Sequence, residues 1–139
     1  MSVSFTILPR RGLVYVRYEG FVHPDDTQKA LAAYSRHPDR APGQKQLVDL
    51  AAVTGYDADY ARILQIQAQK AETFLEQGRQ TVLVYYAPTR IAHEMAAIVR
   101  RSWEGLDGIV MRTAGTEAEA LEILGQPECS LTELLAGAG

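Results

Sequence analysis

The stretch that decides the fold is QLVDLAAVTGYDADY, residues 46–60. Its first part, QLVDL, is short, apolar and bounded by turn residues, which is typical of a buried strand in a parallel sheet. Residues 51–57 are predicted to be a loop at the carboxyl end of that strand. A helix is predicted from about residue 57 to 77, because apolar residues recur there at spacings of three, four and seven, and Gly78 is expected to end it. The stretch therefore predicts a strand, a turn and a helix.

The segments on either side repeat this alternation. TVLVYYA, residues 81–87, is β-branched and aromatic and predicts the strongest strand, with Tyr85 and Tyr86 on opposite faces of it. VSFTILP and GLVYVRYEG predict an antiparallel hairpin at the N-terminus. Further elements are predicted as helices from Pro24, from Thr89 and from Thr116, and as a strand at GIVMR, residues 108–112. This order predicts an α/β fold: an N-terminal β-hairpin followed by βα units, forming a mainly parallel mixed sheet with helices packed on it.

Composition and charge narrow the class of protein. With 139 residues, the chain has the length of one domain, so residues 1–139 are predicted to form a single domain with a terminal helix at about 130–136 as an appendage. A net charge of −3 is too acidic for a general nucleic-acid binder, so no nucleic acid is expected as a partner. No stretch approaches the length of a membrane span, and the N-terminus lacks the features of a signal peptide. A cytoplasmic protein is expected.

Three segments carry a family resemblance: YEGFVHPDDTQKALAAYSRHP (18–38), PGQKQLVDLAAVTGYDADY (42–60) and LVYYAPTRIAHEMAAIVRRSWEG (83–105). In these segments the chain resembles the SpoIIAA-like proteins, relatives of the STAS (anti-anti-sigma factor) domain. The resemblance implies a non-catalytic regulatory or protein-binding module. Its partner would be another protein, and a homodimer is one expected form.

The strand-to-helix junction departs from the pattern of the phosphorylated STAS regulators. In those proteins the strand leads to an Asp-Ser-Ser-Gly motif, and a partner kinase phosphorylates one of the serines. Here Asp49 and Asp57 match aspartates, whereas Ala58, Asp59 and Tyr60 stand at the Ser-Ser-Gly positions. The resemblance therefore implies a lost phosphorylation switch, with Thr54 as the nearest remaining hydroxyl. The predicted partner-binding junction consists of Asp49, Thr54, Asp57, Ala58, Asp59 and Tyr60.

Two interpretations of the acids at this junction stay open. In the first, Asp57 caps or begins the helix and Asp59 complements the positive end of the helix dipole, so both are architectural. In the second, Asp59 is a permanent negative charge that stands in for a phosphoserine and fixes one binding state.

In open parallel sheets, ligands bind beyond the carboxyl ends of the strands. The candidate ligand-binding loops are therefore the three that follow predicted strands, at residues 51–57, 87–90 and 113–116. In the second of these loops Thr89 is expected to cap a helix whose free N–H groups can take an anion, with Arg90 beside them. Thr89, Arg90, Arg112 and Thr116 are therefore the predicted contacts for an anion or ligand. Arg90 at a helix N-terminus opposes the helix dipole, which makes it locally unfavourable there.

An alternative function is a small-ligand or lipid carrier, because the family is also related to lipid-carrying domains. An apolar cavity lined from the second and third helices, with Arg90 or Arg112 at its mouth, would favour the carrier. An exposed apolar patch near Tyr56 and Tyr60 would favour protein binding. No enzyme, metal or cofactor is expected: Cys129 is alone, and His23, His37 and His93 lack the spacing of a metal site.

Overall fold

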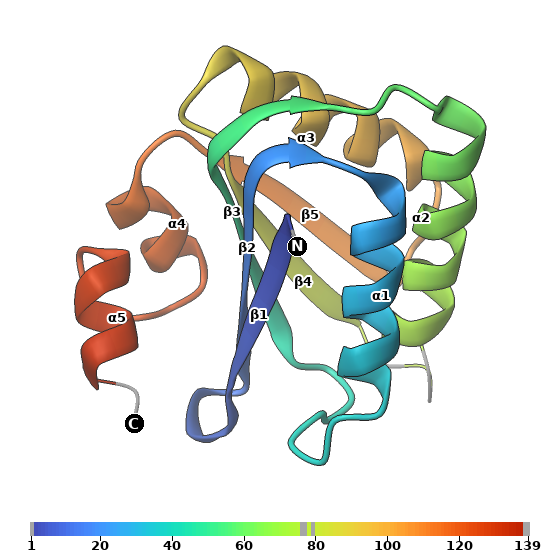
Figure 1. Ribbon diagram of the computed structural model, residues 1–139. Helices are drawn as coiled ribbons and strands as arrows, with labels where there is room; N and C mark the ends of the chain where they lie inside the picture. The colour runs from blue at the N-terminus through green and yellow to red at the C-terminus, as the bar shows by residue number, and fades with distance from the viewer. Residues whose placement is uncertain (1, 76–77, 79, 138–139) are drawn as a thin grey trace.

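The strands lie in the sheet in the same order as in the chain. The computed structural model describes residues 2–75, 78 and 80–137. The described strands are β1 (Val3–Leu8), β2 (Leu13–Val22), β3 (Lys45–Tyr56), β4 (Thr81–Tyr86) and β5 (Ile109–Ala114), in the order β1-β2-β3-β4-β5. β1 pairs antiparallel with β2, and every other pair is parallel. The α/β fold with an N-terminal hairpin and following βα units is confirmed (Figure 1).

Three helices cover one face of the sheet as a consequence of this order. α1 (Pro24–Ser35), α2 (Tyr60–Phe74) and α3 (Arg90–Ser102) each connect two neighbouring parallel strands. Right-handed crossovers that always step in the same direction place their helices on the same face. α4 (Glu117–Ile123) and α5 (Leu131–Gly137) follow the last strand and cover the opposite face (Figure 1).

The sheet separates two cores. The first core lies under α1, α2 and α3 and contains Tyr85 and Trp103, and the second core lies under α4 and α5. Tyr86 packs against the second core, so the predicted opposite orientation of Tyr85 and Tyr86 is confirmed. The terminal helix differs from the expected appendage, because Leu134 of α5 is 0% exposed in the second core.

β3 is longer than the sequence predicts. Residues 51–57 were expected to form a loop, but β3 continues to Tyr56. β3 pairs with β4 only as far as Asp49, and beyond that point it pairs with β2 alone. Two register shifts place extra residues in β3, and Gly20 beside the second shift has a φ of 69°. Bulges of this kind bend a strand.

The bent segment forms what we call the β2–β3 arm, residues 18–22 and 52–56, which curves over the end of the sheet beside α3 (Figure 1). Gly55, a turn signal in the sequence, lies inside this strand. A Cβ at that position would lie 3.1 Å from the ring of Phe21, so the glycine allows a close approach of the two strands. The prediction of a loop was wrong because Gly55 serves packing within the arm and not a turn.

The beginning of α2 also differs from the prediction. α2 begins at Tyr60 and not at residue 57, and its cap is Asp59, whose carboxylate accepts a hydrogen bond of 3.2 Å from the Arg62 N–H. The expected end at residue 77 lies outside the described residues. Within the described ranges, no helix combines the length and apolar character needed to cross a bilayer.

Candidate functional site

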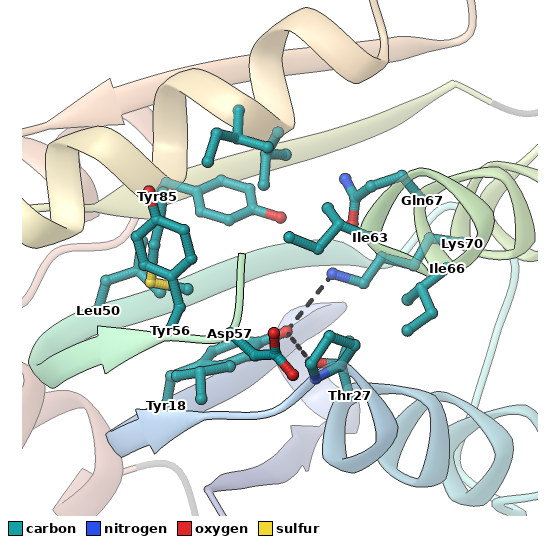
Figure 2. A pocket seen from close by; sticks show the side chains of 15 residues that line it. Tyr18, Thr27, Leu50, Tyr56, Asp57, Ile63, Ile66, Gln67, Lys70 and Tyr85 are labelled. Carbon is teal, nitrogen blue, oxygen red and sulfur yellow. Dashed lines mark hydrogen bonds between the residues drawn. The ribbon is translucent and has the colours of Figure 1, made fainter. Parts of the chain in front are cut away.

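A cavity of about 70 Å³ lies between the first-core face of the sheet and helices α2 and α3 (Figure 2). The β2–β3 arm contributes Tyr18, Val22 and Tyr56 to its wall, so the bend in β3 is what closes it on that side. The helices contribute mainly aliphatic side chains, namely Ile63 and Ile66 of α2 and Met95, Ile98 and Val99 of α3. A cavity lined from the second and third helices, which is one of the features that would favour the carrier, is therefore present.

The amine of Lys70 reaches the inner end of this cavity. Lys70 as a whole residue is partly exposed on α2, and its amine is directed inward, where it is desolvated by the surrounding protein (Figure 2). The ammonium donates a long hydrogen bond of 3.4 Å to the hydroxyl oxygen of Tyr18 and lies 6.0 Å from the centre of that ring. No carboxylate within residues 2–75, 78 and 80–137 lies at ion-pairing distance from it.

Burial on its own lowers the pKa of Lys70, whereas its electrostatic interactions with Tyr18 and Tyr85 and its hydrogen bond to the Tyr18 oxygen raise it. The net result is a pKa raised above the ordinary value for lysine. Lys70 therefore carries a positive charge at neutral pH, inside a cavity with mostly apolar walls. A buried charge without a counter-ion is unusual, because desolvation of an ion is costly.

Tyr85 points its hydroxyl into the same part of the cavity. The residue is 2% exposed, and its hydroxyl has no hydrogen-bond partner among the described residues. Burial raises the pKa of Tyr85 to about 12, although the nearby Lys70 favours the phenolate, so the phenol keeps its proton at neutral pH. Figure 2 shows the hydroxyls of Tyr18 and Tyr85 and the amine of Lys70 directed toward one another. Thr27 supports this cluster by donating to the Tyr18 oxygen at 3.4 Å.

A second cavity, of about 50 Å³, lies on the other side of these groups, toward β1. Tyr18, Thr27, Lys70 and Tyr85 line both cavities. In the second cavity the side-chain nitrogen of Gln46 is buried and without a partner in the described part of the chain. The ammonium of Lys70 therefore sits between two small cavities.

The structure divides the predicted partner-binding junction into two places. Thr54, Asp57, Ala58, Asp59 and Tyr60 are exposed together at the end of β3 and the start of α2. Asp49 does not join them. It is buried on the opposite face of the sheet, because it is one residue away from Leu50 in a strand and side chains alternate between faces.

Asp57 and Asp59 at the junction accept hydrogen bonds from nearby backbone N–H groups. Asp59 caps α2, and the carboxylate of Asp57 accepts a hydrogen bond of 3.2 Å from the Asp59 N–H. Arg62 then pairs with Asp25 of α1 at 3.0 Å. This geometry favours the architectural interpretation of both acids, with Asp59 rather than Asp57 as the cap.

An open depression lies beside the junction, lined by Tyr56, Tyr60 and Leu64 on one side and by residues of α3 on the other. Tyr60 is 56% exposed and Leu64 is 54% exposed. An exposed apolar patch near Tyr56 and Tyr60, the feature that would favour protein binding, is therefore present as well.

The predicted anion contacts do not converge on either cavity. Thr89 and Thr116 cap α3 and α4, where their hydroxyls accept from Ala92 N and Glu119 N. The side chain of Arg90 is 95% exposed and lies 3.8 Å from Glu94, one turn along the same helix. Arg112 donates to the carbonyl oxygen of its neighbour Met111 at 2.9 Å. Neither Arg90 nor Arg112 lines the cavity between α2 and α3, so this part of the arrangement that would favour the carrier is not found among the described residues.

Lys70 is a site residue that was not predicted from the sequence, although its position carries a signal. Lys70 lies seven residues after Ile63 and four after Ile66, so the helical spacing puts it on the buried face of α2. A lysine at a core position of an amphipathic helix is the feature that could have identified the site.

The fold and the site define a class: an α/β protein with a largely apolar cavity that has a lysine amine at its inner end. In comparisons with known proteins, no family model matches this chain and no curated protein matches it. The resemblance to SpoIIAA-like proteins rests on the three segments quoted above and stays a prediction. Among the described residues, no three His, Cys, Asp or Glu side chains are grouped so that they can hold a metal ion.

Proposed function

We propose that this protein is a non-catalytic binding module that holds a small, mainly apolar ligand in the cavity between the sheet, α2 and α3. The observation that carries the proposal is the enclosed ammonium of Lys70 in that cavity, without an ion-pair partner in the described part of the chain. A protein core with no ligand to bind rarely places a charge among aliphatic side chains. This function corresponds to the carrier alternative.

Native mass spectrometry tests the proposal. Protein purified from the cells that produce it is measured under native conditions and again after denaturation, and a mass excess that disappears on denaturation is expected. Val99→Phe places a ring in the cavity wall and should abolish the excess. Leu64→Ala, outside the cavity and 54% exposed, is the control and should keep it. A bare mass for the wild type in every preparation would contradict the proposal.

Protein binding is the second candidate function, favoured by the exposed side chains of Tyr60 and Leu64 beside the junction. Aromatic and aliphatic side chains of this kind are typical anchors of an interface. The same native spectra test whether the protein partner is a second copy of the chain: a homodimer would give twice the chain mass, and a Tyr60→Ser, Leu64→Ser double variant would return the monomer.

If phosphorylation is lost at the junction, as the resemblance implies, incubation with cell extract and ATP should leave residues 54–60 unmodified. Phosphorylation of Thr54 in this experiment would contradict the loss of the phosphorylation switch.

A further inference from the structure

The inner end of the cavity offers hydrogen-bond donors without a partner among the described residues. An ammonium group has three N–H donors and no acceptor. Lys70 uses one of them in the long contact with Tyr18, which leaves two donors without a partner among the described residues. The Tyr85 hydroxyl, also unpartnered there, adds a further donor directed to the same place (Figure 2). A ligand group that satisfies the two free ammonium donors must be an acceptor, and the same group can accept from the Tyr85 hydroxyl.

The positive charge of Lys70 favours an anionic acceptor over a neutral one. Lys70 is enclosed, protonated and not paired with a carboxylate of the described chain. An anion brought by the ligand would supply the missing counter-charge between mostly apolar walls, where water screens it less than at the surface. Hydrogen bonds between charged groups are also roughly twice as strong as those between neutral groups.

The other walls of the cavity limit the size and the polarity of the rest of the ligand. The cavity is about 70 Å³ and lined chiefly by aliphatic side chains, so the body of the ligand must be short and apolar. Asp57 is exposed and lines the margin of the same cavity. A ligand with a second negative group at its outer end would be repelled there.

We propose that the ligand is a small monocarboxylate, bound with its carboxylate against Lys70 and Tyr85 and with its short apolar body between α2 and α3. This assignment rests on the proposed function, since it names the chemical class that the cavity selects.

Isothermal titration calorimetry on the full chain tests the assignment. The probes are the straight-chain carboxylates from butanoate to decanoate and the corresponding primary amides, which have nearly the same shape without the charge. In the wild type, the best carboxylate should bind at least about tenfold more tightly than its amide. In Lys70→Met this ratio should fall to about one, while the amide still binds.

Two further variants make the test specific. Lys29→Met removes an exposed lysine of α1 outside the cavity and should keep the wild-type ratio. Tyr85→Phe removes one donor, retains Lys70 and should lower carboxylate affinity more than amide affinity, which preserves the test if Lys70→Met does not fold. Equal binding of amides and carboxylates to the wild type would overturn the carboxylate assignment and leave the proposed function standing. No binding by either series, together with a bare native mass, would overturn both.

Discussion

The hydroxyl of Tyr15 donates a hydrogen bond of 2.5 Å to the carboxylate of Asp49, on the face of the sheet opposite the cavity. Burial, together with this carboxylate, raises the pKa of Tyr15 above its ordinary value, so the phenol keeps its proton. Asp49 also accepts a hydrogen bond of 3.0 Å from Ala51 N–H, at the point where the first register shift gives β3 an extra residue. The pair therefore stabilises the bend from which the β2–β3 arm begins.

Tyr15→Phe should lower the free energy of unfolding by about 1–3 kcal/mol, because it removes the donor to Oδ2 of the buried Asp49 carboxylate and leaves only the Ala51 N–H bonded to Oδ1 among the described residues. Urea unfolding followed by circular dichroism measures the change. In the wild type, the raised pKa of Tyr15 also makes stability fall as pH rises above about 10, because the unfolded phenol ionises first. An unchanged midpoint in Tyr15→Phe would show that the hydrogen bond contributes nothing.

Tyr85→Phe should have the opposite sign. The hydroxyl of Tyr85 is buried without a partner in the described residues, so its removal should raise the free energy of unfolding by about 1 kcal/mol in ligand-free protein. Tyr15→Phe is the matched control, since the same atom is deleted on the other face of the same sheet. If both variants lose stability equally, the Tyr85 hydroxyl has a hydrogen-bond partner within the protein. It is then not a donor that is free to bind the ligand.

Asp59→Ala should lower the free energy of unfolding by about 1 kcal/mol through loss of the helix cap, whereas Asp59→Asn should stay within a few tenths. Asparagine keeps the cap and removes the charge, so the pair separates capping from charge. Thr54→Ala, at an exposed position, is the control. A large loss in Asp59→Asn would favour the interpretation of Asp59 as a required negative charge.

The affinity for carboxylates should be nearly constant from about pH 6 to about pH 9. The raised pKa of Lys70 means that the amine stays charged through this range and loses its proton only above the ordinary lysine value of about 10.4. On the acid side, affinity should fall as the ligand itself is protonated, near about pH 4–5. Calorimetry at three pH values between these limits measures it. A steep loss between pH 7 and pH 9 would show that Lys70 deprotonates there.

The alternation of strand and helix patterns was enough to predict the fold class and the opposite faces of Tyr85 and Tyr86. The extent of β3 could not be predicted in the same way. Its second half is a strand only because β2 pairs with it across two register shifts, and such shifts depend on contacts between segments distant in sequence.

The candidate site was predicted only in part. A cavity between the second and third helices with Arg90 or Arg112 at its mouth was named as the feature that would favour a carrier, but the cation that lines the cavity is Lys70. Arg90 was chosen from its place in a loop, and a long surface side chain there turns to the nearest acid, Glu94. Asp49 was assigned to the junction because it matches an aspartate of the family motif. The alternation of side chains along a strand is enough to place it on the opposite face of the sheet from Leu50.

The order of the strands has a consequence for synthesis of the chain. Each strand pairs with the strand made immediately before it, so a nascent polypeptide never has to insert a later strand between two earlier ones. The β1–β2 hairpin can form first, and each following unit of helix and strand extends one growing edge. The second face differs: Leu131 and Leu134 belong to α5, the last described helix, so the apolar residues of that face are covered only after every strand has left the ribosome.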